Sequence, residues 1–166
     1  MDDLNTETDF NSRSAPKVTV RLNSDCHEGL STLANLHKRS LNGECVMGLE
    51  RWLDHQAQTT AVLKLIAGPL KEVAVKAVLE EVPLVTDEPG VPSDKISFML
   101  RYTPYIRKRI AEISSETNVS AHSVMLTALA WWVNTSRQAN ALLAASLGTP
   151  GIHHAGLLDH SAIPAA

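Results

Sequence analysis

The sequence contains one pattern of residues twice, at a constant offset of 80 positions. Nine positions of the first copy recur in the second without a gap: Val18, Val20, Leu22, Leu30, Leu33, Ser40, Val46, Leu49 and Trp52 correspond to Phe98, Leu100, Tyr102, Ile110, Ile113, Ser120, Leu126, Leu129 and Trp132. Arg21 also recurs, as Arg101. A fixed period defines the structural unit that a chain repeats, so it constrains the fold more than any single segment does.

Each unit is predicted to be a short strand followed by two helices. Residues 17–22 and 95–102 alternate between polar and apolar side chains, which is typical of a strand with one buried face. Apolar residues at helical spacing follow twice in each unit, behind candidate capping residues: Asn23-Ser24-Asp25 and Ser40 in the first copy, Thr103 and Ser120 in the second. A lone strand cannot satisfy its own backbone groups, so the two strands are expected to pair antiparallel above four helices. The predicted fold class is therefore mainly α, with two short antiparallel strands, four helices and an extra helical spacer.

Five segments are predicted along the chain. Residues 1–16 form a disordered acidic arm, 17–54 the first copy, 55–94 a helical spacer and Pro-rich linker, 95–138 the second copy, and 139–166 an Ala-rich flexible tail. The spacer is expected to hold two short helices, at 59–66 and 70–81, separated by Gly68-Pro69. The net charge of −3 is unevenly distributed, since the second copy carries +4 while the arm and the spacer carry −3 each.

Composition favours a folded protein of the cytoplasm. Hydrophobic residues make up 44% of the 166 residues, and no stretch approaches the roughly 18 apolar residues of a membrane span. The first residues lack the basic and apolar regions of a secretion signal. The two cysteines are 19 residues apart and are expected to be reduced thiols, with Cys45 inert on an apolar stripe and Cys26 exposed in a first helical turn.

The two units resemble the ribbon-helix-helix repressors, the family of the Arc and methionine repressors. The resemblance is carried by Lys17-Val18-Thr19-Val20-Arg21-Leu22 and by Arg39-Ser40-Leu41-Asn42-Gly43-Glu44; it covers residues 17–54 strongly and 95–134 moderately. Two copies in one chain resemble the TraY family of plasmid-conjugation proteins. The resemblance implies that the two strands form a ribbon that enters the major groove of DNA. It also implies a bacterial host, with the protein associated with the nucleoid or a plasmid.

The resemblance further implies roles for individual residues. The outward strand residues would read bases: Lys17, Thr19 and Arg21 in the first copy, and Lys95, Ser97, Met99 and Arg101 in the second. The start of each second helix would bind a phosphate, at Ser40, Asn42, Ser120 and His122. Arc has a buried Arg–Glu–Arg triad; Arg39 and Glu44 match two of its members, and Gly48 stands in place of the third. In the second copy His122 replaces Asn42 and Val124 replaces Glu44, so copy one is interpreted as the specific reader and copy two as its strand partner and electrostatic anchor.

The predicted function is sequence-specific binding of double-stranded DNA by a transcriptional repressor or autoregulator, at non-palindromic or directly repeated subsites. Strand pairing between like copies of two chains is an open alternative to pairing within one chain. An antitoxin-type or relaxosome accessory protein, whose spacer or tail binds a protein partner, is the alternative function, and a pure dimerisation scaffold is a third. Self-association on adjacent subsites and a toxin or relaxosome protein are the further candidate partners; no membrane is expected. No catalytic constellation, cofactor or metal is predicted, and His153, His154 and His160 are interpreted as residues of the tail.

Overall fold

The computed structural model describes residues 14–54, 56–85 and 94–148, and these form six helices and one two-stranded antiparallel sheet. The strands are β1 (Lys17–Asn23) and β2 (Lys95–Arg101). The helices are α1 (Ser24–Leu36), α2 (Leu41–Asp54), α3 (Gln56–Ala67), α4 (Glu72–Glu80), α5 (Pro104–Thr117) and α6 (Ala121–Ser146). The prediction of a mainly helical fold with two short antiparallel strands is confirmed.

The two strands pair within the chain, and their register is centred on the repeat. Thr19 faces Met99, and these residues occupy the same position in the two copies. On either side of this pair, Lys17 faces Arg101 and Arg21 faces Ser97. Lys17 corresponds to Ser97 in the repeat, and Arg101 corresponds to Arg21. The two flanking pairs therefore occupy equivalent positions of the repeat. The ribbon therefore has a local two-fold arrangement centred on Thr19 and Met99.

The same repeat is visible where the helices begin and end. Four side chains cap the helices, each accepting a backbone N–H three residues ahead at 2.7–3.2 Å: Asn23 from Cys26, Ser40 from Gly43, Thr103 from Ile106 and Ser120 from Ser123. Of the three residues predicted to cap the first helix, Asn23 is the one that does so. Between the two helices of each copy the chain turns through a left-handed residue, Lys38 (φ 56°) in one and Asn118 (φ 55°) in the other. The same left-handed turn thus occurs at matched positions of the two copies.

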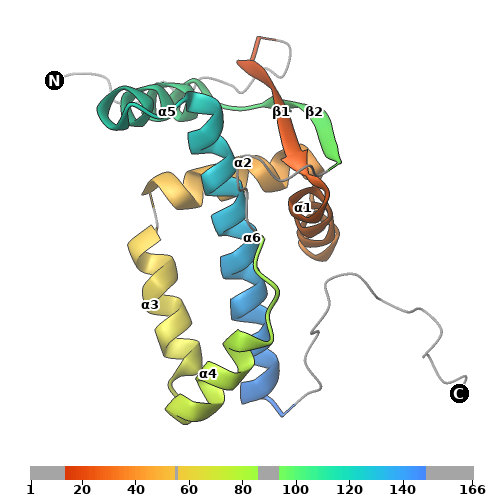
Figure 1. Cartoon of the computed structure of the whole chain (residues 1–166), viewed down its shortest axis with the longest axis vertical. Helices are drawn as coiled ribbons and strands as arrows, with labels where there is room; N and C mark the ends of the chain where they lie inside the picture. Colours follow the sequence, from red (N-terminus) through yellow and green to blue (C-terminus); the bar gives the residue numbers. More distant parts are fainter. Residues whose placement is uncertain (1–13, 55, 86–93, 149–166) are drawn as a thin grey trace, which may run out of the picture.

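Helix α6 is the long axis of the molecule. Its 26 residues span about 39 Å, and every other described helix packs against it. Figure 1 shows the strands, α1, α2 and α5 gathered around one half of α6, with α3 and α4 beside the other half. Both spacer helices thus pack on α6 of the second copy, and α3 also contacts α2 of the first.

The second half of α6 corrects the boundary predicted at residue 138. The helix continues through Ser146, and Ala141 and Leu142 are buried. Alanine and leucine are strong helix formers, and α3 and α4 supply the surface against which these turns are buried. The predicted spacer helices are confirmed with shifted bounds. Residues 1–13 of the predicted arm, 86–93 of the linker and 149–166 of the tail lie outside the described residues.

The core lies between the ribbon and the helices. Val20, Leu22 and Leu100 of the inward strand faces are at most 1% exposed. Cys26, expected to be exposed, is buried instead. Its counterpart in the second copy, Ile106, is also buried, so the position faces the core in both copies. Both cysteines are free thiols, and burial is the largest cause that raises the pKa of Cys45. Within the part of the chain that is described, no helix is both long enough and apolar enough to cross a membrane.

Candidate nucleic-acid interface

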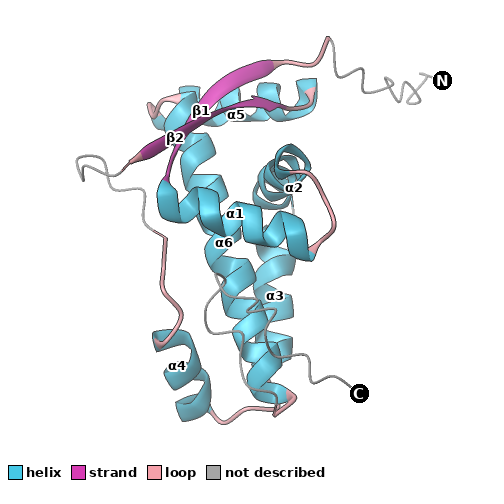
Figure 2. Cartoon of the chain, turned by 90° about the vertical axis from the view of Figure 1, so that its right-hand side faces the viewer, coloured by secondary structure: helices cyan, strands magenta, loops and turns pink. Residues whose placement is uncertain are grey.

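The outward face of the ribbon collects the residues that the sequence nominated for reading bases. All seven are exposed: Lys17, Thr19, Arg21, Lys95, Ser97, Met99 and Arg101. They share one face because side chains alternate along each strand while the register pairs odd-numbered positions with odd-numbered positions. Figure 2 shows the two strands crossing one end of the molecule above α1. The ribbon therefore presents a narrow strip of seven side chains, supported from beneath by the core.

The chemistry of this strip changes from its centre to its ends. At the centre, the hydroxyl of Thr19 lies opposite the thioether of Met99, which is 56% exposed. Lys17 and Arg101 place two cations opposite one another on one side, whereas Arg21 faces the neutral Ser97 on the other. Arginine presents a planar fork of donors that fits the edge of guanine, and methyl or thioether groups offer apolar contact.

The start of α2 is fastened to the end of β2 by Asn42. Its Nδ2 donates to the carbonyl oxygen of Arg101 at 2.9 Å, and its Oδ1 accepts the Arg101 N–H at 2.8 Å. The side chain that was predicted to contact a phosphate thus bonds the backbone of the strand. The hydroxyl of Ser40 accepts the N–H of Gly43 at 3.0 Å, and Ser120 accepts that of Ser123 at 3.1 Å.

Three of the four side chains predicted to bind phosphate, those of Ser40, Asn42 and Ser120, form hydrogen bonds within the protein. The hydroxyls of Ser40 and Ser120 are used to cap their own helices. His122, the counterpart of Asn42, is half-buried at the start of α6. Other N–H groups of the first helical turns are the donors that remain for an anion. Because Asn42 holds α2 against Arg101, the start of α2 lies at the end of the ribbon formed by Lys17 and Arg101.

A buried carboxylate joins the two copies behind the ribbon. Glu44 is fully buried and forms the predicted pair with Arg39, at 3.7 Å from Nη1 to Oε2. His37 Nδ1 lies 2.9 Å from Glu44 Oε1, and the indole Nε1 of Trp132 donates to the same oxygen at 2.8 Å. A Cβ at Gly48 would lie 2.8–3.0 Å from atoms of Trp132, so the indole packs directly on the backbone of α2. The Trp132 donor, contributed by the other copy, was not predicted from the sequence.

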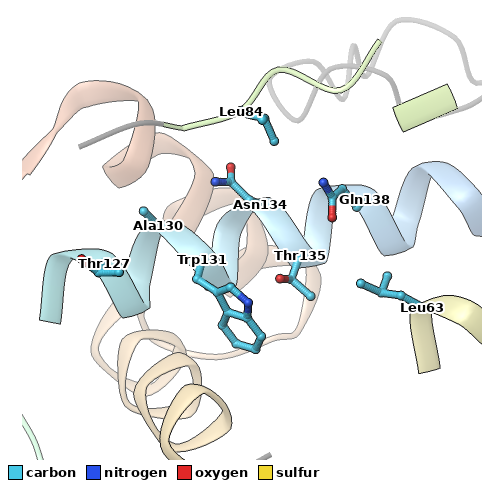
Figure 3. A pocket seen from close by; sticks show the side chains of 8 residues that line it. All are labelled: Leu63, Leu84, Thr127, Ala130, Trp131, Asn134, Thr135 and Gln138. Atoms are coloured by element: carbon cyan, nitrogen blue, oxygen red, sulfur yellow. The ribbon is translucent and has the colours of Figure 1, made fainter. Parts of the chain in front are cut away.

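One further hollow lies away from the ribbon. A cleft of about 540 Å³ is lined by eight residues: Leu63, Leu84, Thr127, Ala130, Trp131, Asn134, Thr135 and Gln138. Six of them come from α6, while Leu63 comes from α3 and Leu84 from the segment after α4 (Figure 3). Asn134 bonds both the N–H and the carbonyl of Val85, at 2.8 and 3.0 Å, which fixes this segment on α6. The lining groups are aliphatic, aromatic, hydroxyl and amide groups.

Two further observations bear on the assignment. Over residues 14–54, 56–85 and 94–148, no group of three or more His, Cys, Asp or Glu side chains is placed to hold a metal ion, and His153, His154 and His160 lie outside these ranges. A scan against protein-family models, a search of the curated proteins and a search of the solved structures each gave no match. Residue chemistry and geometry therefore carry the functional argument.

Proposed function

We propose that this chain is a tandem ribbon-helix-helix protein that binds double-stranded DNA through its two-stranded ribbon. The ribbon inserts into the major groove, where each base pair presents a distinct pattern of donors, acceptors and methyl groups. Arg21 and Arg101 bind guanine edges, Thr19 and Met99 contact the central base pairs, and Lys17, Lys95 and Ser97 complete the reading surface. The protein acts as a transcriptional repressor or autoregulator by occupying its operator.

The observation that carries this proposal is the division of the ribbon into two faces. The inward residues Val20, Leu22 and Leu100 are buried, while all seven outward residues are exposed. Lysine and arginine on exposed strands also serve to block aggregation. That role does not require two strands centred on matched positions of a repeat, with the start of α2 fastened beside Arg101. A ribbon that reads bases in the major groove would use both features.

The outward residues also predict the form of the operator. Lys17 of the first copy corresponds to Ser97 of the second, and Thr19 corresponds to Met99. The two halves of the ribbon thus present different groups to the two halves of a binding site. We therefore expect a non-palindromic site, or directly repeated subsites, in place of the palindromes that symmetric dimers select.

Selection of binding sites from a random duplex library tests the proposal, with wild-type protein and the variants Arg21→Ala and Arg101→Ala. Loss of a bidentate contact to guanine costs about 1–3 kcal/mol, or roughly 5- to 150-fold in affinity for the selected site. Each variant should also lose preference at one position of the site. Lys76→Ala is a matched control, because Lys76 is an exposed cation on α4, away from the ribbon.

The results separate the proposal from its alternatives. A selected site whose recognition weakens in both arginine variants and is unchanged in Lys76→Ala supports ribbon reading. Failure to enrich any sequence, or equal affinity of all four proteins, contradicts it. Sedimentation of the complex reports whether one or two chains occupy each site.

A second candidate function, a protein partner bound by the spacer, is favoured by one specific observation. Leu65 of α3 and Val73 of α4 are 79% and 81% exposed, although α3 and α4 both pack on α6. Exposed apolar side chains on the spacer are expected if it binds a protein partner, as in an antitoxin-type or relaxosome accessory protein. Purification from the native host should then recover a stoichiometric protein that Leu65→Ser with Val73→Ser removes while DNA affinity is kept. Recovery of the chain without such a protein contradicts this function.

A further inference from the structure

The two ends of the ribbon differ sharply in charge, although the repeat makes them structurally equivalent. The Arg101 end is defined by seven positions: Lys17, Lys38, Arg39, Arg101, Tyr105, Arg107 and Lys108. The Arg21 end is defined by their counterparts in the repeat: Ser97, Asn118, Val119, Arg21, Asp25, His27 and Glu28. The first set carries six cations and no acid, whereas the second carries one cation and two acids.

Three features of the fold bring the six cations to one end. Antiparallel pairing places Lys17 opposite Arg101. The Asn42 side chain holds the start of α2 on Arg101, and Lys38 and Arg39 lie just ahead of that helix. These contacts join residues of the first copy to a strand of the second.

The remaining two cations come from α5. This helix begins at Pro104, three residues after Arg101, and Lys108 is four residues farther along, a rise of about 6 Å. Arg107 and Lys108 are both exposed. They therefore lie in the first turns beside the same end of the ribbon, where a partner that engages the ribbon would meet them.

Most of this charge is available to a partner. All six cationic residues are exposed. Within the described residues, Arg39 is the one cation of the set that forms an ion pair, with the buried Glu44, and the hydroxyl of Tyr105 donates to Asp54. Arg109 of α5 lies outside the set and pairs with Glu112 at 2.7 Å, so neither arginine adds unpaired charge to this end. The other five cations of the set pair with no acidic side chain of the described residues, and together they form a positive surface at this end of the ribbon.

A positive surface of this kind fits the phosphodiester backbone that flanks a major groove. DNA carries one charge per about 1.7 Å of helix axis, and neutralising phosphates releases counterions, which favours binding. Cations that served only solubility would not need to gather at one of two equivalent ends. The opposite end, with Asp25 and Glu28, would repel the same backbone.

We propose that the Arg101 end is a one-sided phosphate anchor, which grips the DNA backbone beyond the bases read by the ribbon on that flank alone. The inference rests on the proposed DNA-binding function and adds a direction to it. The protein binds its site in one orientation, and its footprint extends farther on the anchored flank. The anchor belongs to one end of the ribbon and draws residues from both copies; it does not coincide with the second copy, to which the sequence had assigned it.

The experiment measures affinity for the selected duplex while its two flanks are shortened separately. Removing the anchored flank should weaken binding by roughly 10- to 60-fold at 0.1 M salt, since one phosphate contact is worth about eightfold there relative to 1 M. Shortening the other flank by the same length should change affinity less than about twofold. Arg107→Gln with Lys108→Gln should weaken the requirement for the anchored flank, because two of the six cations are removed.

Salt dependence supplies a second readout on the same variants. Loss of two phosphate contacts reduces the slope of log affinity against log salt by about 1.8, so the ratio of wild-type to variant affinity falls about 12-fold between 50 and 200 mM. The matched control is Asp25→Asn with Glu28→Gln, which changes two charges at the counterparts of Tyr105 and Lys108. This control should retain the flank requirement. Helical circular dichroism confirms that each variant is folded.

The possible failures are distinguishable. If selection yields no preferred sequence, the proposed function is wrong, and the proposal of a phosphate anchor is wrong as well. If the ribbon selects a site but both flanks matter equally, only the one-sided anchor is overturned. The same holds if the glutamine variant keeps the wild-type flank requirement.

Discussion

Gly48 is the position where one added methyl group should most disturb the contact between the two copies. A Cβ there would lie 2.8 Å from Cγ, 2.9 Å from Cδ1 and 3.0 Å from Cβ of Trp132. The indole cannot shift freely, because its Nε1 donates to the buried Glu44 at 2.8 Å. Gly48→Ala must therefore move α2 away from α6 or break this hydrogen bond.

The magnitude follows from two opposing effects. Overpacking a tight contact costs about 1–3 kcal/mol, whereas replacing glycine by alanine inside a helix contributes about 1 kcal/mol of stability. Gly48→Ala should therefore lower the free energy of unfolding by about 0–2 kcal/mol in the wild-type protein. In a Trp132→Ala background the ring is absent, and the same change should raise the free energy of unfolding by about 1 kcal/mol.

The assay is a double-mutant cycle of four proteins unfolded in urea and followed by circular dichroism. Trp132→Ala alone should cost about 3–5 kcal/mol, so the unfolding curves are recorded in a stabilising osmolyte such as sucrose. The coupling energy between Gly48 and Trp132 should be about 1–3 kcal/mol. If Gly48→Ala has the same effect in both backgrounds, the packing of Trp132 on α2 is refuted.

Three further predictions concern single residues. Asn42→Ala should lower the free energy of unfolding by about 1–2 kcal/mol and speed hydrogen exchange at the Arg101 amide, and unchanged exchange would count against the fastening of α2. Lys38→Gly should raise the free energy of unfolding by about 1 kcal/mol, because φ is 56° there and glycine adopts such angles without strain. The same change should weaken DNA binding, because a cation is lost. A lower melting temperature would contradict the left-handed turn. Cys45 should react with a thiol reagent at pH 8 only as fast as the protein unfolds, because burial raises its pKa; rapid labelling of the folded protein would show that it is accessible.

The buried face of each strand and the starts of the helices in the two copies could be predicted because they are encoded locally and repeated. Alternation of side chains identifies the buried face of each strand, and a one-residue slip would expose the core residues Val20 and Leu100. A capping oxygen acts on an N–H only three residues ahead, so its role is visible in the sequence itself. Both signals depend on neighbours along the chain.

The contacts that depend on distant partners could not be predicted in this way. Trp132 and Glu44 are 88 residues apart, and their hydrogen bond exists because the pairing of the strands brings α6 across α2. The length of α6 depends likewise on α3 and α4, against which Ala141 and Leu142 are buried. The burial of Cys26, by contrast, could have been predicted from the repeat, because its counterpart Ile106 is apolar.

Pairing within one chain explains how two moderately charged copies produce a strongly polar ribbon. At the seven positions that define an end, two first copies paired with each other would give +2 at both ends, and two second copies would give +3 at both ends. Pairing the first copy with the second gives +6 at one end and −1 at the other, a total of +5 that lies between the +4 and +6 of the two like-paired ribbons. Only the mixed ribbon therefore distinguishes the two directions along DNA by charge. Pairing within one chain always combines the first copy with the second, whereas separate copies would form this mixed ribbon only as one of three combinations.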